Sequence, residues 1–176
     1  MLVWVDTETT GLEYDALLLE LAIVVTGDNL KPLANRSWVI HHHKDVVALR
    51  LNAWPRKQHG ESGLLEEVEA SKQMTPLVEK EAYNWLKEEL GEAHCGKLPM
   101  CGSSVQFDRG KLEHGMPKLV ELFHYRNVDV SSIKELAKRW HPELELPEKS
   151  EAHRAMADIM ESIALLRFFK KTFFEG

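Results

Sequence analysis

The stretch LVWVDTET, residues 2–9, decides the fold and also raises the question of function. Its first half is an apolar run rich in β-branched and aromatic residues, which is typical of a buried strand. Successive side chains of a strand point to opposite faces, so Asp6 and Glu8 share one face. Two carboxylates at the end of a core strand repel each other and are costly to bury. The pattern predicts a cation between them, although an isolated Asp-x-Glu is more often a solvated strand end.

The rest of the chain indicates an α/β fold. LLLELAIVV (17–25) and SWVIHH (37–42) predict two further strands, so the sheet opens with a three-strand meander. Later segments alternate between strand and helix, and Thr75 and Pro76 are expected as N-cap and first residue of one helix. Residues 52–63 are polar and predict a loop. Strands are expected at 98–105, up to a turn at Gly102, and at 127–130, with helices at 75–90, 111–123, 131–140 and 153–174. This order predicts a mixed central sheet, an antiparallel meander plus parallel strands, flanked by helices.

Size and composition suit one domain spanning residues 1–176. The chain has 176 residues, of which 44% are hydrophobic and 28% charged, as in soluble globular proteins. It has no apolar run of membrane-spanning length and no signal-peptide pattern, so we expect a cytoplasmic protein without membrane partners. Cys95 and Cys101, even with His94, lack the fourth ligand of a zinc site and are expected as idle thiols.

Charge limits the possible partners. The formal net charge is −6, whereas proteins that hold long nucleic acids usually carry a basic excess, because neutralised phosphates release counterions. If this protein acts on nucleic acid, we expect it to hold a short piece in a local pocket.

Three further residues complete a constellation with Asp6 and Glu8. Asp108 follows a strand and its turn, while His153 and Asp158 flank the start of the last helix. Each taken alone is more often a turn, cap or surface residue. Together with DTETTGL, they resemble the five-residue active site of the DEDDh exonucleases, the superfamily of RNase T and the proofreading exonucleases.

A closer resemblance covers most of the chain. Segments from the first strand to the last helix are similar, in order and spacing, to the oligoribonuclease family. They are LVWVDTETTGL, W…HGESGL, CGSS…D, HYRNVDVSSIKELAKRWHPE and HRAMADIMESI. The resemblance implies a ribonuclease H-like fold and a 3′-to-5′ exoribonuclease that cuts dinucleotides and very short oligoribonucleotides to nucleoside 5′-monophosphates.

The expected chemistry agrees with these residue types. Two divalent ions, Mg²⁺ or Mn²⁺, can clamp the attacking and leaving oxygens of a phosphodiester, and both ions prefer oxygen ligands. The predicted ligands are Asp6, Glu8, Asp108 and Asp158, so the cation between the first two would be metal. His153 is the expected general base, which takes a proton from the attacking water.

The resemblance also implies how substrate is held. Leu12 is expected to wedge between bases and Trp54 to stack on one, unless Trp54 is only a loop anchor. A polar cluster would close over the terminal 5′-phosphate, through bidentate arginine bonds and single hydroxyl bonds. Its members would be His59, Ser104, Arg126 and Ser131, although the two serines can instead be turn and helix caps. Tyr125 matches a tyrosine that reaches the partner subunit's site, so the resemblance implies a homodimer.

This chain departs from the family pattern at several positions. Thr7 and Thr9 replace the usual Leu and Met, Phe107 replaces a polar residue, and Ala157 replaces the first Asp of a pair. The threonines are common in DNA-proofreading relatives, so an exonuclease that trims longer single-stranded DNA or RNA stays the alternative. An idle binding module is a further alternative, disfavoured because all five catalytic residue types are present.

Overall fold

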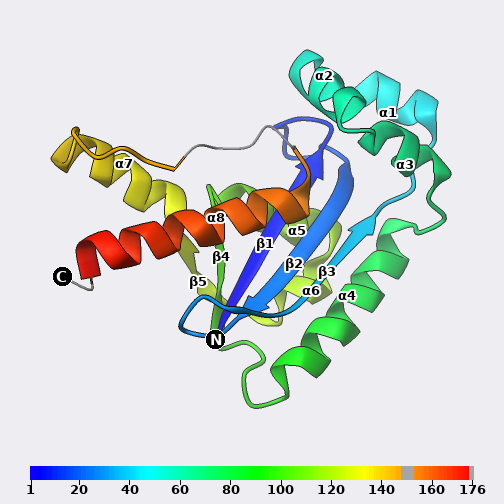
Figure 1. Ribbon diagram of the computed structural model, residues 1–176. Helices are drawn as coiled ribbons and strands as arrows, with labels where there is room; N and C mark the ends of the chain where they lie inside the picture. Colours follow the sequence, from blue (N-terminus) through cyan, green and yellow to red (C-terminus); the bar gives the residue numbers. More distant parts are fainter. Residues whose placement is uncertain (148–152, 175–176) are drawn as a thin grey trace.

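The computed structural model describes residues 1–147 and 153–174, and within these ranges the strands form one five-stranded sheet (Figure 1). The order is β3-β2-β1-β4-β5. The central strand β1 runs antiparallel to β2, which is antiparallel to β3, while β4 is parallel to both β1 and β5. The bounds are β1 Leu2–Thr9, β2 Leu18–Thr26, β3 Pro32–Val39, β4 Leu98–Gly102 and β5 Phe123–Asp129. The mixed sheet confirms the predicted fold class, and the first three strands form the predicted meander.

Helices cover both faces of the sheet. On one face lie α4 (Thr75–Leu90), α5 (Gln106–Gly115) and α6 (Pro117–Val120), and on the other lie α7 (Val130–Trp140) and α8 (Ala155–Phe169). A π-helical turn, Lys170–Phe174, extends α8. Three short helices, α1 (Lys44–Arg50), α2 (Ala53–Glu61) and α3 (Leu64–Ala70), lie near the carboxyl end of β1 (Figure 1).

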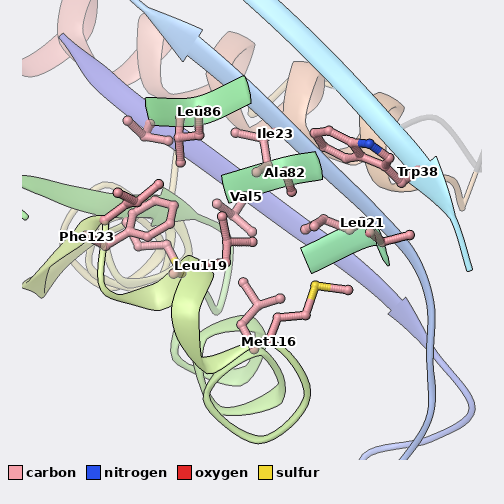
Figure 2. Close-up of a cluster of buried hydrophobic side chains, with 14 of the residues drawn as sticks. Val5, Leu21, Ile23, Trp38, Ala82, Leu86, Met116, Leu119 and Phe123 are labelled. Atoms are coloured by element: carbon pink, nitrogen blue, oxygen red, sulfur yellow. The ribbon is translucent and has the colours of Figure 1, made fainter. Parts of the chain in front are cut away.

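The alternation along β1 separates two hydrophobic cores. Val3 and Val5 pack with α4, α5 and α6, in the cluster that Figure 2 shows around Ala82, Leu86 and Met116. Trp4 instead packs with residues of α7 and α8. By the period of two, Asp6 and Glu8 continue the face covered by α8, whereas Thr7 continues the face covered by α5.

Several predicted elements differ in the structure. Residues 52–63 are mostly helix α2 rather than loop, because Pro55 lies in the first turn, where a helix tolerates proline, and is buried together with His59. The helix predicted at 111–123 is broken near Gly115 and Pro117, and its end belongs to β5. Helix α4 has Met74, not Thr75, as its N-cap. In the described part of the chain, every helix is too short or too polar to cross a membrane.

Candidate active site

Three carboxylates meet beside the carboxyl end of β1. Asp6 and Glu8 come from the strand, and Asp158 comes from the first turn of α8. One oxygen from each lies within 4.8 Å of the other two. The β1 alternation and the packing of α8 on β1 and β2 produce this arrangement. Among the described residues, this is the group with the donor set of a metal site, and hard oxygen donors so close together suit Mg²⁺ or Mn²⁺.

The fourth predicted ligand, Asp108, lies beside this group and is not part of it. It is 4% exposed on α5 and accepts two hydrogen bonds at Oδ1, from Thr7 N at 2.9 Å and Thr7 Oγ1 at 2.7 Å. Strand β4 pairs with β1 at Val3 and Trp4, before Thr7, and the Asp108 carboxylate accepts the Thr7 N–H in place of a neighbouring strand. Asp108 thus reaches β1 from the α5 side.

Burial raises the pKa of Asp108 to about 7, while the two bonds from Thr7 oppose the rise and the charge of Asp129 adds to it. A carboxyl with this pKa is partly protonated at neutral pH. A divalent cation bound nearby would favour the ionised form, so ionisation of Asp108 would be coupled to metal binding. The Thr7 departure therefore has a structural role, because its hydroxyl holds this carboxyl.

A cavity of about 490 Å³ opens over the three carboxylates. His153 lines it, and its ring lies edge-on to that of Trp54 with centroids 5.7 Å apart. Ser104 and Ser131 also line it, and Ser104 Oγ donates to Ser131 Oγ at 3.3 Å. Of the seven predicted substrate-binding residues, the structure thus brings Trp54 and the two serines into the cavity that the three carboxylates line. The volume is typical of sites for small ligands.

His59 lies beneath the site instead of in the cavity. It is 1% exposed, and its Nε2 lies 2.9 Å from the Thr9 carbonyl, which can only accept, so this nitrogen carries the hydrogen. Burial lowers the pKa of His59, so the ring is neutral at pH 7, and Nδ1, 3.8 Å from Glu8 Oε2, forms no ion pair. The ring is therefore buried beside Glu8 and does not line the cavity, and its contact with a substrate phosphate stays a prediction.

Leu12, Tyr125 and Arg126 lie outside the described lining of the cavity. Leu12 is 80% and Tyr125 74% exposed, and the Arg126 guanidinium lies over the Tyr125 ring at 5.4 Å from its centroid. The Leu12 carbonyl accepts a bond from Lys111 Nζ at 3.3 Å, which anchors the backbone and leaves the side chain in solvent. Within the described residues, Leu12, Tyr125 and Arg126 therefore do not join the group around the three carboxylates, and their role in substrate binding stays a prediction.

Two charged residues of the cavity lining were missed by the sequence analysis. Lys134 lies three residues after Ser131 on α7, and Glu161 three residues after Asp158 on α8. Residues three apart share a helix face, so this spacing was the available signal. With Glu161, four acidic side chains line the cavity. Among the described residues, Lys134 is the only lysine or arginine in its lining. Such a cavity repels phosphate unless cations neutralise it.

The other departures lie around this site. Thr9 Oγ1 donates to the Gly11 carbonyl at 2.8 Å, which shapes the turn after β1. The Phe107 ring lies under Lys111 Nζ at 4.9 Å from its centroid. Nothing in the structure explains Ala157.

Comparison with known proteins places the chain among exonucleases. Residues 3–166 match the family model for the RNase T exonucleases. The chain is 40% identical to an oligoribonuclease of Acinetobacter baylyi over 175 residues, covering 98% of this chain and 94% of that protein. It is 41% identical to an oligoribonuclease of Thiobacillus denitrificans, with 98% and 94% covered.

Solved structures of exonuclease I resemble the fold. The zinc-bound E. coli exonuclease I–ssDNA complex superposes with a TM-score of 0.73 at 16% identity, and exonuclease I of Methylocaldum szegediense with 0.67 at 16%. The alignments cover 98% of this chain, which spans about 40% of the length of either enzyme. At this identity the likeness concerns the fold alone.

Proposed function

This chain belongs to the oligoribonuclease family of RNase T-type exonucleases, and on that premise we propose that it hydrolyses dinucleotides and very short oligoribonucleotides from the 3′ end. The products would be nucleoside 5′-monophosphates. The observation that carries the proposal is the convergence of Asp6, Glu8 and Asp158 within 4.8 Å, in a cavity that His153 also lines. The small cavity and the net charge of −6 favour a short substrate over a long strand.

We propose two divalent ions, Mg²⁺ or Mn²⁺, as the cofactors. Asp6, Glu8 and Asp158 would hold them, with Asp108 as the neighbouring fourth carboxylate. When bound, such ions neutralise charge on the phosphate and lower the pKa of water. The four acidic side chains lining the cavity support this assignment, because an anionic substrate has little affinity for them alone.

The chain's own residues supply the proton transfer and the positioning. His153 accepts the proton of the attacking water on its imidazole as the water oxygen bonds to phosphorus. The P–O3′ bond breaks, and the leaving 3′ oxygen keeps the electron pair and takes a proton from solvent water to become the 3′-hydroxyl. Trp54, beside His153, stacks on a base, so the scissile phosphate lies between the aromatic ring and the carboxylates. Ser104, Ser131 and Lys134 lie on the cavity wall with oxygen and ammonium donors suited to a terminal phosphate.

We further propose a cytoplasmic homodimer. The exposed Leu12, Tyr125 and Arg126 would complete the site from the edge of the cavity, with Tyr125 reaching the partner's site. Both cysteines are free thiols, as is usual in a reducing compartment. Light scattering coupled to size-exclusion chromatography measures the molar mass in solution and tests the dimer. The mass of a monomer at micromolar concentration would contradict it.

The deciding experiment compares turnover of a 5′-phosphorylated dinucleotide and a 20-mer RNA, each with Mn²⁺ and with EDTA. We expect Mn²⁺-dependent cleavage with a strong preference for the dinucleotide. The His153→Ala variant should lower kcat by roughly 10²–10⁴ with little change in KM. Faster cleavage of the 20-mer would favour the trimming exonuclease, and turnover in EDTA would contradict the metal assignment.

A further inference from the structure

Arg154, the residue after His153, joins three parts of the fold. Its Nε and one terminal nitrogen donate to the two oxygens of Glu20 on β2, both at 3.1 Å. Its two terminal nitrogens also donate to the two oxygens of Glu67 on α3, both at 2.8 Å. The guanidinium thus makes two bidentate pairs, the geometry in which arginine binds carboxylates most strongly.

Glu20 ties this ion-pair network to the catalytic strand. It is 2% exposed and lies directly opposite Glu8 in the β1–β2 register. Directly opposite residues of antiparallel strands have close side chains on one face, and like charges there repel. The Arg154 guanidinium supplies the positive charge beside Glu20 that a buried carboxylate requires.

The same contacts fix the start of α8. Glu20 Oε2 also accepts a bond from Ala155 N at 3.1 Å, so one carboxylate holds both the side chain of Arg154 and the first residue of the helix. The Arg154 carbonyl accepts from Asp158 N at 3.0 Å. Asp158 and Arg154 therefore move together as parts of one helical turn.

His153 has a backbone conformation that requires such support. Its φ is +43°, in the left-handed region that L-residues with a β-carbon rarely adopt. Strained residues of this kind persist where the surrounding structure over-determines them. The residue that follows His153 is held by four side-chain bonds, which is a direct means of holding that conformation.

We propose that Arg154 is a positioning residue. Its bonds to Glu20 and Glu67 hold His153 and Asp158 in place beside Asp6 and Glu8. The inference rests on the proposed catalytic role of His153. It predicts a kcat effect, because misplacing a base and a ligand by about 1 Å can cost on the order of 10²-fold in rate while substrate contacts remain.

The test uses the full chain and the variants Arg154→Met and Arg154→Lys. The control is Arg36→Met, because Arg36 also pairs with a glutamate, Glu81 at 3.2 Å, on the opposite side of the sheet. Two quantities are measured: kcat and KM on a 5′-phosphorylated dinucleotide with Mn²⁺, and the NMR signal of the Trp54 indole N–H. That ring contacts His153 and reports its position without turnover.

Arg154→Met should lower kcat by roughly 10²-fold with KM within about 2-fold, and should shift the Trp54 signal. Arg154→Lys keeps the positive charge but cannot make the bidentate bonds of a guanidinium, so its kcat should lie between those of Arg154→Met and the wild type. Arg36→Met should match the wild type in both readouts. If Arg154→Met keeps wild-type kcat, or if its Trp54 signal does not move, the inference is overturned.

Loss of the arginine leaves the buried Glu20 carboxylate without its cation, with the bond from Ala155 N alone, which can prevent folding. In that case the double variant Glu20→Gln/Arg154→Met, in which the buried charge is also removed, is judged by the same two readouts. If the wild type itself shows no turnover, the proposed function fails, and the Trp54 signal then decides the positioning role by itself.

Discussion

Asp108→Asn should make the metal-free protein more stable at pH 8 while abolishing catalysis. Burial favours the neutral form of this carboxyl and raises its pKa from 3.8 to about 7. The folded state therefore binds the proton more tightly than the unfolded state. Its contribution to stability is fully present below pH 3.8 and is lost as the pH rises toward 7, where the folded-state carboxyl also ionises.

The magnitude follows from this shift. About three pKa units at ~1.4 kcal/mol each give a cost of roughly 4 kcal/mol for ionised Asp108 above pH 7. Asparagine avoids that cost, and its amide oxygen can still accept the bonds from Thr7. Its buried amide hydrogens lack acceptors, however, which reduces the gain by about 1–2 kcal/mol. We therefore expect a net gain of roughly 2–3 kcal/mol, or about 4–12 °C in Tm for a chain of this size.

Thermal unfolding of wild type and Asp108→Asn in EDTA, from pH 4 to pH 8, measures this gain. The Tm of Asp108→Asn minus the Tm of the wild type should be near zero or negative at pH 4. This difference should become positive and grow as the pH rises, and it should level off above pH 7. Asp45→Asn is the matched control, because Asp45 is 77% exposed on α1 and should show no such difference. A difference independent of pH, or a less stable Asp108→Asn at pH 8, would refute the reasoning.

Three further variants test separate parts of the site. Thr7→Val removes the 2.7 Å bond to Asp108 and should lower the free energy of unfolding by about 1–2 kcal/mol in urea titrations; an unchanged midpoint would contradict that bond. Trp54→Ala should weaken dinucleotide binding by about 1–3 kcal/mol in calorimetry with Ca²⁺ replacing the catalytic metal, and equal affinity would make Trp54 a mere loop anchor. Lys134→Met should weaken binding and reduce the slope of log K against log salt by about 1, and an unchanged slope would remove Lys134 from the phosphate contacts.

The local pattern of the sequence was enough to predict that the two carboxylates of β1 share one face. The alternation in residues 2–9 placed Asp6 and Glu8 on one face, and the structure brings Asp158 to the same group. Strand periodicity is a property of the backbone, so it needs no knowledge of what packs on the sheet. The strands of the meander were predictable for the same reason.

Only the tertiary structure decided how the remaining site residues lie. Asp108 meets Thr7 across 101 positions of sequence, and its burial on the α5 side sets its pKa. His59 is buried beside Glu8 because residues 52–63, whose polar composition had predicted a loop, form helix α2, from which the ring reaches the Thr9 carbonyl at the end of β1.

The contact between Arg154 and Glu20 spans 134 positions and was invisible to any local pattern. Periodicity reports which face a residue occupies, whereas partners and burial depend on which distant segments share that face. The sequence by itself therefore determined the residue types of the carboxylate group and the shared face of Asp6 and Glu8. The packing of α5 and α8 on the sheet, and the bond from α2 to the end of β1, decided which of these residues meet, how deeply each is buried and what holds it in place.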